Sequence, residues 1–310
     1  MGTVISMKDS DKVLMEKIKS DVVFQLQFDM MDGEDVDKIV HQYHQYEADQ
    51  QSNHRRDFNN TNYGYKLVNN GDTRRSILTM NNDVFIAGLQ DYYHQYNIPR
   101  LDYNMPAPLR NDLYQLYHHV YAMMRRMMML ISKDVFNDVN YLQNYIAKEN
   151  FVMVFNYYYA VDGAPKAELT CKRFDEHYDF SLISVIFNDD YLYKEFNFEY
   201  EKDGEWRSLD NQDHRFTVFF GMLMEIVTDG AYKALNHRTV MQGANRNRFM
   251  VGFFAQPDED KQLQICDQHA HLLDGYQYDH FNREISYNTF MRETMCSQLL
   301  KLDLVDEAVA

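Results

Sequence analysis

The chain has 310 residues, of which 45% are hydrophobic, and this share is enough to bury a sizeable core. Its 31 basic and 47 acidic side chains give a formal charge of −16, which disfavours a nucleic-acid partner because the protein repels phosphate backbones. No basic amphipathic segment and no apolar run of roughly 18 residues is present, so the sequence predicts no membrane partner.

The first half of the chain predicts one strand followed by helices. Residues 20–29 alternate apolar and polar side chains as a strand does, and residues 32–50 predict a helix opened by acidic residues. Residues 51–75 are polar and rich in asparagine, which indicates a long loop around a short strand, and residues 82–97 predict another helix. The longest helical candidate is 109–132, where apolar side chains recur at three- and four-residue steps as a buried stripe: Leu113, Leu116, Val120, Met124, Met127 and Leu130.

The pattern of residue types changes at residue 150. Short runs rich in aromatic and β-branched residues follow one another, punctuated by Asp-Gly and Gly breaks, and this pattern favours a double-sheet jelly roll. Residues 256–271 indicate a loop and residues 284–300 a closing helix. We therefore predict a β-rich α+β fold in a single domain over 1–310, with an N-terminal strand and helical region (1–149), a jelly-roll core (150–257) and a C-terminal loop and helix (258–310).

The three cysteines predict a reducing compartment. Cys171, Cys266 and Cys296 are odd in number and show no paired spacing, which is typical of free thiols rather than of a disulfide framework. The sequence therefore predicts a cytoplasmic protein.

A histidine and an aspartate two residues apart stand just before the apolar run SLISVIFND. If the segment is extended, His177 and Asp179 point to the same face, where they are either two metal ligands or two polar residues on a wet strand. His237 stands on another predicted strand, 60 residues later. Two histidines and one carboxylate form the facial triad of non-haem Fe(II) oxygenases, which leaves positions open for a co-substrate and O₂.

Two other histidine groups compete with this triad as metal sites. Cys266, His269 and His271 lie close together, but in a segment that indicates a loop and without an obvious fourth ligand. The adjacent His118 and His119 fall in the long predicted helix, where neighbouring side chains diverge by about 100°, which favours a structural role.

A bidentate acid on the open metal positions would carry a second carboxylate that needs an anchor. Arginine suits this task, because its planar fork holds a permanent charge. Arg246 and Arg248 follow His237 by nine and eleven residues and share a face of a predicted strand, where the alternative is solvent exposure at the strand start.

Five segments, in order over roughly 150–257, resemble one family. FNYYYA resembles LNYYP, HYDFSLISVIFND resembles HTDxSxxTxLxQD, and KDGEWRSLD resembles DGKWIPVDP. FGMLMEIVTDGAYKALNHRTV resembles xGDxLExxSNGxYKSxxHRVV, and RFMVGFF resembles RxSxxFF. These are motifs of the isopenicillin-N-synthase-like branch of the Fe(II)/2-oxoglutarate-dependent oxygenases.

The resemblance implies a double-stranded β-helix, a dioxygenase activity on a small molecule, and Fe(II), 2-oxoglutarate and O₂ as cofactor and co-substrates. It implies that His177, Asp179 and His237 bind the iron. It further implies that Arg248 binds the far carboxylate of 2-oxoglutarate, flanked by Asn156 and Tyr158.

The chain departs from the family pattern at several positions. Met250 replaces the serine of RxS, which removes a hydrogen bond to the co-substrate, and Tyr178 replaces the threonine between the ligands. These departures question the use of 2-oxoglutarate, because some relatives dispense with it. The divergent motifs suggest specialised or amino-acid-derived substrates, with hydroxylation, desaturation or ring closure as outcomes.

The sequence leaves several possible substrates open. The algal kainoid synthases are a narrower suggestion that no quoted motif separates from other members. An acidic substrate would need a basic residue, for which Arg246, Lys172 and Arg173 are candidates, each also readable as a solvated surface charge. The competing classes are a non-catalytic jelly-roll binding protein and a zinc-dependent enzyme.

Overall fold

The computed structural model describes most of the chain. The described residues are 3–27, 31, 33–52, 64–70, 73–81, 106–147, 151–160, 172–193, 197–209, 214–240, 246–274, 276, 278 and 280–294. The helix predicted over 82–97 lies outside them.

The larger of two facing sheets has the strand order β1-β2-β10-β7-β12-β5-β4-β3. Its neighbours pair antiparallel except β1 and β2, which are parallel. The side chains of β7 and β10 are buried on both faces, which explains why these strands read as continuous apolar runs. The bounds are β1 (Thr3–Ser6), β2 (Val23–Gln27), β3 (Gly64–Asn70), β4 (Thr73–Asn81), β5 (Phe151–Tyr158), β7 (Ile183–Asn188), β10 (Phe216–Phe220) and β12 (Arg248–Ala255).

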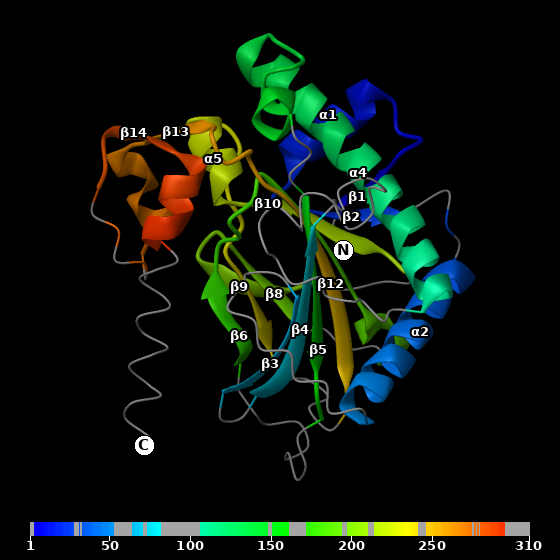
Figure 1. The fold of residues 1–310 in the computed structure, drawn as a ribbon. Helices are drawn as coiled ribbons and strands as arrows, with labels where there is room; N and C mark the ends of the chain where they lie inside the picture. Colours follow the sequence, from blue (N-terminus) through cyan, green and yellow to red (C-terminus); the bar gives the residue numbers. More distant parts are fainter. Residues whose placement is uncertain are drawn as a thin grey trace, which may run out of the picture.

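The smaller sheet lies against one face of the larger one (Figure 1) and has the order β6-β11-β8-β9. Its strands are β6 (Lys172–His177), β8 (Phe198–Lys202), β9 (Glu205–Ser208) and β11 (His237–Val240). An apolar cluster joins the two sheets, and in it the ring of Phe198 lies 5.7 Å from that of Phe219 on β10. The predicted α+β fold with a jelly-roll core is therefore confirmed.

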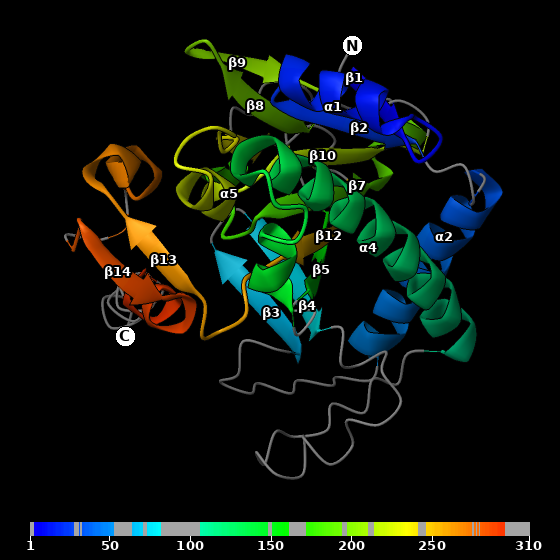
Figure 2. The same cartoon turned by 90° about the horizontal axis from the view of Figure 1, so that it is seen from above.

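Helices cover the opposite face of the larger sheet, as Figures 1 and 2 show. They are α1 (Asp11–Ser20), α2 (Gly33–Ser52) and α4 (Ala107–Phe136). Tyr43 of α2 stacks on Phe155 at 5.0 Å between ring centroids and packs on Phe249 at 4.5 Å, so aromatic rings join this helix to β5 and β12.

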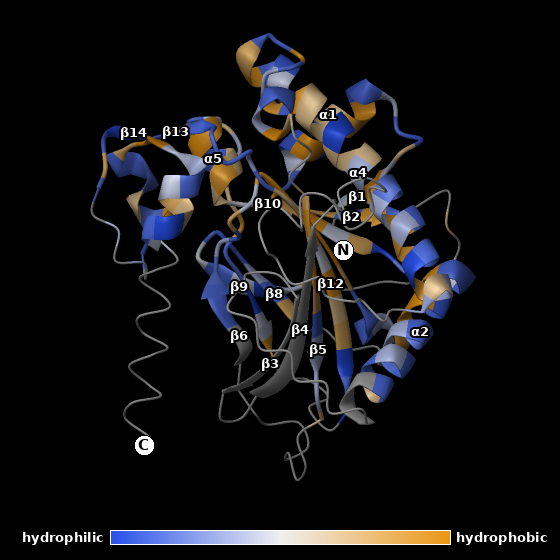
Figure 3. Cartoon of the chain, viewed as in Figure 1, coloured by the Kyte–Doolittle hydropathy of each residue, from blue (hydrophilic) through white to orange (hydrophobic). Residues whose placement is uncertain are grey.

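The long helix α4 carries the predicted apolar stripe, although Leu130 is only partly buried. It starts after Pro106, whose fixed φ suits a helix N-terminus, and ends at Asn137 in the left-handed conformation with φ 53°. Figure 3 shows the apolar colour concentrated on the central strands β10 and β12, against which the helical layer packs. Within the described residues, no helix has both the length and the apolar content that a bilayer-crossing segment requires.

Three local predictions are wrong. Residues 64–70 and 73–81 form two long paired strands rather than one short strand in a loop. Residues 222–227, which fall among the short strands predicted after residue 150, form the helix α5 (Met222–Val227), because Gly221 lets the backbone approach closely enough for the first N–H groups of the helix to bind the carbonyls of Asp179 and Ser181. The predicted loop at 256–271 contains β13 (Gln262–Ile265), which pairs with β14 (Arg283–Ser286) ahead of the closing helical residues 287–294.

Three short 3₁₀ helices also lie within the described residues: η2 (Leu142–Ile146), η3 (Asp189–Tyr193) and η4 (Asp267–Leu272).

We expect α4 to contribute to stability through its buried methionines. Met128→Ala should lower the free energy of unfolding by about 2–5 kcal/mol, because it leaves a cavity where the side chain is fully buried. Met129, the next residue, is 42% exposed, so Met129→Ala is the matched control and should change stability by no more than about 0.5 kcal/mol. Urea unfolding measures both, and equal losses in the two variants would contradict the packing described above.

Candidate metal centre

Two paired strands of the smaller sheet bring the two histidines together. In the antiparallel register of β6 and β11, His237 lies directly opposite His177. Side chains of such a pair share a face, with Cβ atoms about 4.5–5.5 Å apart. The imidazole centroids accordingly lie 4.3 Å from each other.

The carboxylate of the candidate triad comes from a turn rather than from the strand. β6 ends at His177, so Asp179 lies just beyond the strand, in the turn that leads into β7, and its carboxylate still points toward the same site as His177. The N-terminus of α5 holds this turn, because the N–H of Met222 donates to the carbonyl of Asp179 (2.9 Å) and that of Leu223 donates to Ser181 (3.1 Å). Gly221 permits the contact, since a Cβ there would lie 2.4 Å from the Ser181 carbonyl oxygen.

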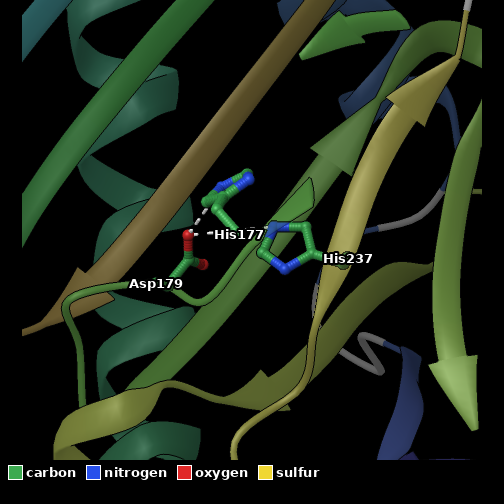
Figure 4. Close-up of side chains that lie close together, drawn as sticks. All are labelled: His177, Asp179 and His237. Carbon is green, nitrogen blue, oxygen red and sulfur yellow. Dashed lines mark ion pairs between the residues drawn. The ribbon is translucent and has the colours of Figure 1, made fainter. Parts of the chain in front are cut away.

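The three side chains converge on one point, as Figure 4 shows. Asp179 Oδ1 lies 3.4 Å from Nε2 of His177 and 3.8 Å from Nε2 of His237. Asp179 and His237 are buried, whereas His177 is partly exposed. Among the residues that the structure describes, this is the one group of three with ligand atoms within 4.8 Å of one another.

Neighbouring groups orient each ligand atom. The Nδ1 atoms of His177 and His237 lie 2.7 Å and 3.2 Å from the carbonyls of Asp175 and Leu235, so each Nδ1 donates to a carbonyl and each Nε2 keeps a lone pair for a metal. Ser184 Oγ donates to Asp179 Oδ2 at 2.6 Å, which directs Oδ1 toward the imidazoles. The donor set of two imidazoles and one carboxylate fits Fe(II).

Burial and charge set protonation states that suit metal binding. Burial, helped by His177, lowers the pKa of His237 to about 4, so its imidazole is neutral at pH 7. Burial alone would raise the pKa of Asp179, but the two histidines and the Ser184 hydrogen bond together hold it below its ordinary value. Both groups are thus in their ligating forms near neutral pH.

The residues predicted to bind the co-substrate lie together on neighbouring strands. β5 and β12 pair so that Tyr158 lies opposite Arg248, and Asn156 opposite Met250. These four alternate with Tyr157 and Phe249, which point to the helical layer. Asn156 Nδ2 lies 4.0 Å from the Met250 sulfur, so the serine position of the family is filled by a thioether.

Arg248 is 2% exposed and forms a two-point ion pair with Asp190. Its Nε lies 2.8 Å from Asp190 Oδ1 and its Nη2 lies 3.0 Å from Oδ2. Burial would lower the pKa of Arg248, but Asp190 raises it above its ordinary value. Nη1 is buried and has no hydrogen-bond partner among the described residues. Sequence reasoning missed Asp190, and its only signal was the Asp-Asp doublet after the apolar run.

The weaker candidates lie in two places. Arg246 contacts both carboxylates of the doublet Asp189–Asp190, with guanidinium nitrogens 3.8 Å from Asp189 and 3.5 Å from Asp190. Lys172 and Arg173 lie on β6, with side chains outside the described part of the structure.

The competing histidine groups make other contacts. His269 Nδ1 accepts from the N–H of Cys266 (3.1 Å) and caps η4, while His271 lies 3.2 Å from Glu225. His118 is exposed on α4 and packs on Tyr114. Neither group forms a ligand cluster within the described residues.

Part of the chain matches a known family. Residues 149–257 match the sequence model described as the 2OG-Fe(II) oxygenase superfamily. This match confirms the family resemblance noted from the motifs, while the kainoid-synthase suggestion stays a prediction.

Curated relatives align over part of their length. The chain is 35% identical over 96 residues to 1-aminocyclopropane-1-carboxylate oxidase 1 of Doritaenopsis sp., covering 31% of this chain and 28% of the relative. It is 24% identical over 182 residues to jasmonate-induced oxygenase 2 of Arabidopsis thaliana, covering 56% and 47%. The chain thus aligns with less than half of either relative.

Solved structures share the fold over nearly the whole chain. A putative 2OG-Fe(II) oxygenase family protein of Caulobacter crescentus has a TM-score of 0.71 at 15% identity, covering 94% of this chain and 97% of that one. The dioxygenase for auxin oxidation of rice has a TM-score of 0.68 at 14% identity, covering 96% of both chains.

The convergent geometry predicts one metal site per chain. His177→Ala, Asp179→Ala and His237→Ala each remove one ligand. Each should abolish anaerobic Fe(II) binding at this site, because two remaining ligands bind the ion much more weakly than three. Ser184→Ala keeps all three ligands but frees Asp179, and should weaken binding roughly tenfold or more. Calorimetric titration measures both, with Ser286→Ala, at a partly exposed serine, as the matched control. Full iron retention in the three ligand variants would refute the site.

Gly221 provides a test of the turn that carries Asp179. Gly221→Ala should displace that turn and weaken Fe(II) binding by roughly tenfold or more, because the new methyl meets backbone that cannot rotate away. Gly204 is the control: it has φ +78° and open space around it, so Gly204→Ala should cost about 1 kcal/mol of stability and leave metal affinity intact. Unchanged iron affinity in a folded Gly221→Ala protein would contradict this role.

Proposed function

We propose that the protein is an Fe(II)- and 2-oxoglutarate-dependent dioxygenase that acts on a small molecule, because residues 149–257 match the 2OG-Fe(II) oxygenase superfamily. The observation that carries the proposal is the convergence of His177, Asp179 and His237, with both Nδ1 atoms held by carbonyls and Nε2 directed at the carboxylate. A binding protein on the same scaffold would not need this arrangement.

The chain's own residues would hold and orient the reactants. His177, Asp179 and His237 would bind the iron and leave its remaining positions to a bidentate 2-oxo acid and O₂. Fe(II) in this setting supplies the activation of O₂ for C–H abstraction, coupled to the conversion of 2-oxoglutarate to succinate and CO₂. The aromatic wall beside His237, formed by Phe198 and Phe219, excludes water from that side of the site.

Arg248 would anchor the far carboxylate of 2-oxoglutarate. A buried guanidinium nitrogen without an acceptor is costly, and a carboxylate oxygen would satisfy Nη1. Tyr158, whose ring lies 5.4 Å from Arg248 Cζ, and Asn156 would line the same space. Met250 offers no hydroxyl there, so the carboxylate would depend more heavily on the arginine.

We propose a specialised-metabolite or amino-acid-derived substrate, with hydroxylation, desaturation or ring closure, including kainoid-type cyclisation, as the outcome. The relatives named for jasmonate and for 1-aminocyclopropane-1-carboxylate, and the solved Neurospora crassa structure in complex with alpha-KG and thymine, support a small molecule. Arg246, Lys172 and Arg173 stay predictions for a substrate carboxylate, as does the cytoplasmic location.

Succinate release with Fe(II), O₂ and ascorbate tests the proposal. We expect slow succinate formation by the wild type without substrate, and a rise in the KM for 2-oxoglutarate of roughly tenfold or more in Arg248→Lys, because a point charge cannot replace the fork. Arg126 on α4 also binds through several N–H groups but lies in the helical layer, so Arg126→Lys is the matched control and should keep the wild-type KM. No succinate from an iron-loaded wild type, offered a broad panel of acids and amino acids, would favour a binding protein or a member that does not use 2-oxoglutarate.

A further inference from the structure

Asp190 is a fully buried carboxylate whose partners are all inside the fold. It accepts from Nε and Nη2 of Arg248, and Asn197 Nδ2 donates to Oδ1 at 2.8 Å. Its backbone N–H is held by Asn188 Oδ1 at 3.1 Å. These contacts fix the carboxylate on one edge of the guanidinium.

This placement leaves the other edge of Arg248 for a ligand. Nη2 carries a second N–H, and Nη1 is buried without an acceptor among the described residues. An incoming group could therefore bind the edge formed by Nη1 and Nη2, while the adjacent edge, formed by Nε and Nη2, already binds Asp190.

The charges around the fork already balance without a ligand. Arg246 and Arg248 face Asp189 and Asp190, and Asp189 also contacts His44 Nε2 at 2.9 Å and the N–H of Phe249 at 3.1 Å. A carboxylate that binds Nη1 would add an unbalanced negative charge close to Asp190 in a region of low dielectric constant. A neutral acceptor, such as an amide oxygen, would satisfy the same N–H without that repulsion.

We propose that Asp190 is a specificity-determining residue that competes with the far carboxylate of the 2-oxo acid, so that the site accepts 2-oxo acids with a neutral polar end almost as well as 2-oxoglutarate. This inference rests on the proposed function. It adds a class of co-substrate, defined by a 2-oxo acid head for the metal and a hydrogen-bond acceptor of either charge for Arg248.

Anaerobic calorimetry on the Fe(II)-loaded protein tests the proposal without turnover. The probes are 2-oxoglutarate and its terminal amide, 2-oxoglutaramate. In the wild type the two should bind within about tenfold of each other, because the advantage of a charged acceptor is offset by Asp190. In Asp190→Asn, which keeps an oxygen for Nε, 2-oxoglutarate should tighten by roughly tenfold or more while the amide changes by less than about threefold.

Asp189→Asn is the graded comparison. It removes the same charge one residue away, from a carboxylate that contacts His44, the N–H of Phe249 and Arg246 (3.8 Å) but makes no hydrogen bond to Arg248. 2-Oxoglutarate should therefore tighten by clearly less in Asp189→Asn than in Asp190→Asn. The wild-type ratio is measured on an unaltered fold, so it decides the question even if Asp190→Asn does not fold.

Two results overturn the inference while leaving the proposed function intact. One is a wild-type preference for 2-oxoglutarate over the amide of more than about tenfold, and the other is unchanged or weaker 2-oxoglutarate binding in a folded, iron-binding Asp190→Asn protein. Binding of neither probe to the iron-loaded wild type overturns the proposed function and this inference with it.

Discussion

The pairing of β6 with β11 is the constraint on which the site depends. His237 meets His177 only in this register, and a slip of one residue would turn one imidazole to the other face of the sheet. The strands alone do not complete the triad. Asp179 reaches the imidazoles because the turn after β6 is held by the first N–H groups of α5, where Gly221 leaves room for close approach. Sheet register and a helix N-terminus thus place the three ligand atoms jointly.

The two ends of the site are stabilised in different ways. At the metal end, short hydrogen bonds to backbone carbonyls and to Ser184 orient groups that are neutral or ready to bind a cation. At the far end, Arg248 and Asp190 are buried ions, each of which would be costly to bury alone. Their pairing removes most of that cost, and it also weakens the electrostatic attraction between Arg248 and a second anion. The thioether of Met250 acts in the same direction, because it offers a ligand no hydroxyl.

The C-terminal segment contacts the metal turn rather than forming a site of its own. Tyr178, between two candidate ligands, packs edge-on against His271 at 6.1 Å between ring centroids. The buried Glu225 of α5 binds Lys233 (2.9 Å) and lies 3.2 Å from His271, which joins η4 to the helix that supports Asp179. Three of the four ring nitrogens of the η4 histidines already have partners: His269 Nδ1 caps η4, and the two nitrogens of His271 contact the carbonyl of Gln268 and the carboxylate of Glu225.

The sequence by itself indicated the jelly-roll core and the long helix α4 through side-chain periodicity. It indicated the candidate triad and Arg248 through residue types at fixed spacing together with the family resemblance. It misplaced the strands at 64–81 and at 262–265, where polar composition hid the pairing of backbones. Only the tertiary structure decided that Asp179 lies in a turn and that Asp190 occupies one edge of Arg248. Both facts depend on contacts between segments about 40 to 60 residues apart, and the free energy of a buried charge is set by the partners that folding brings to it, which no local pattern encodes.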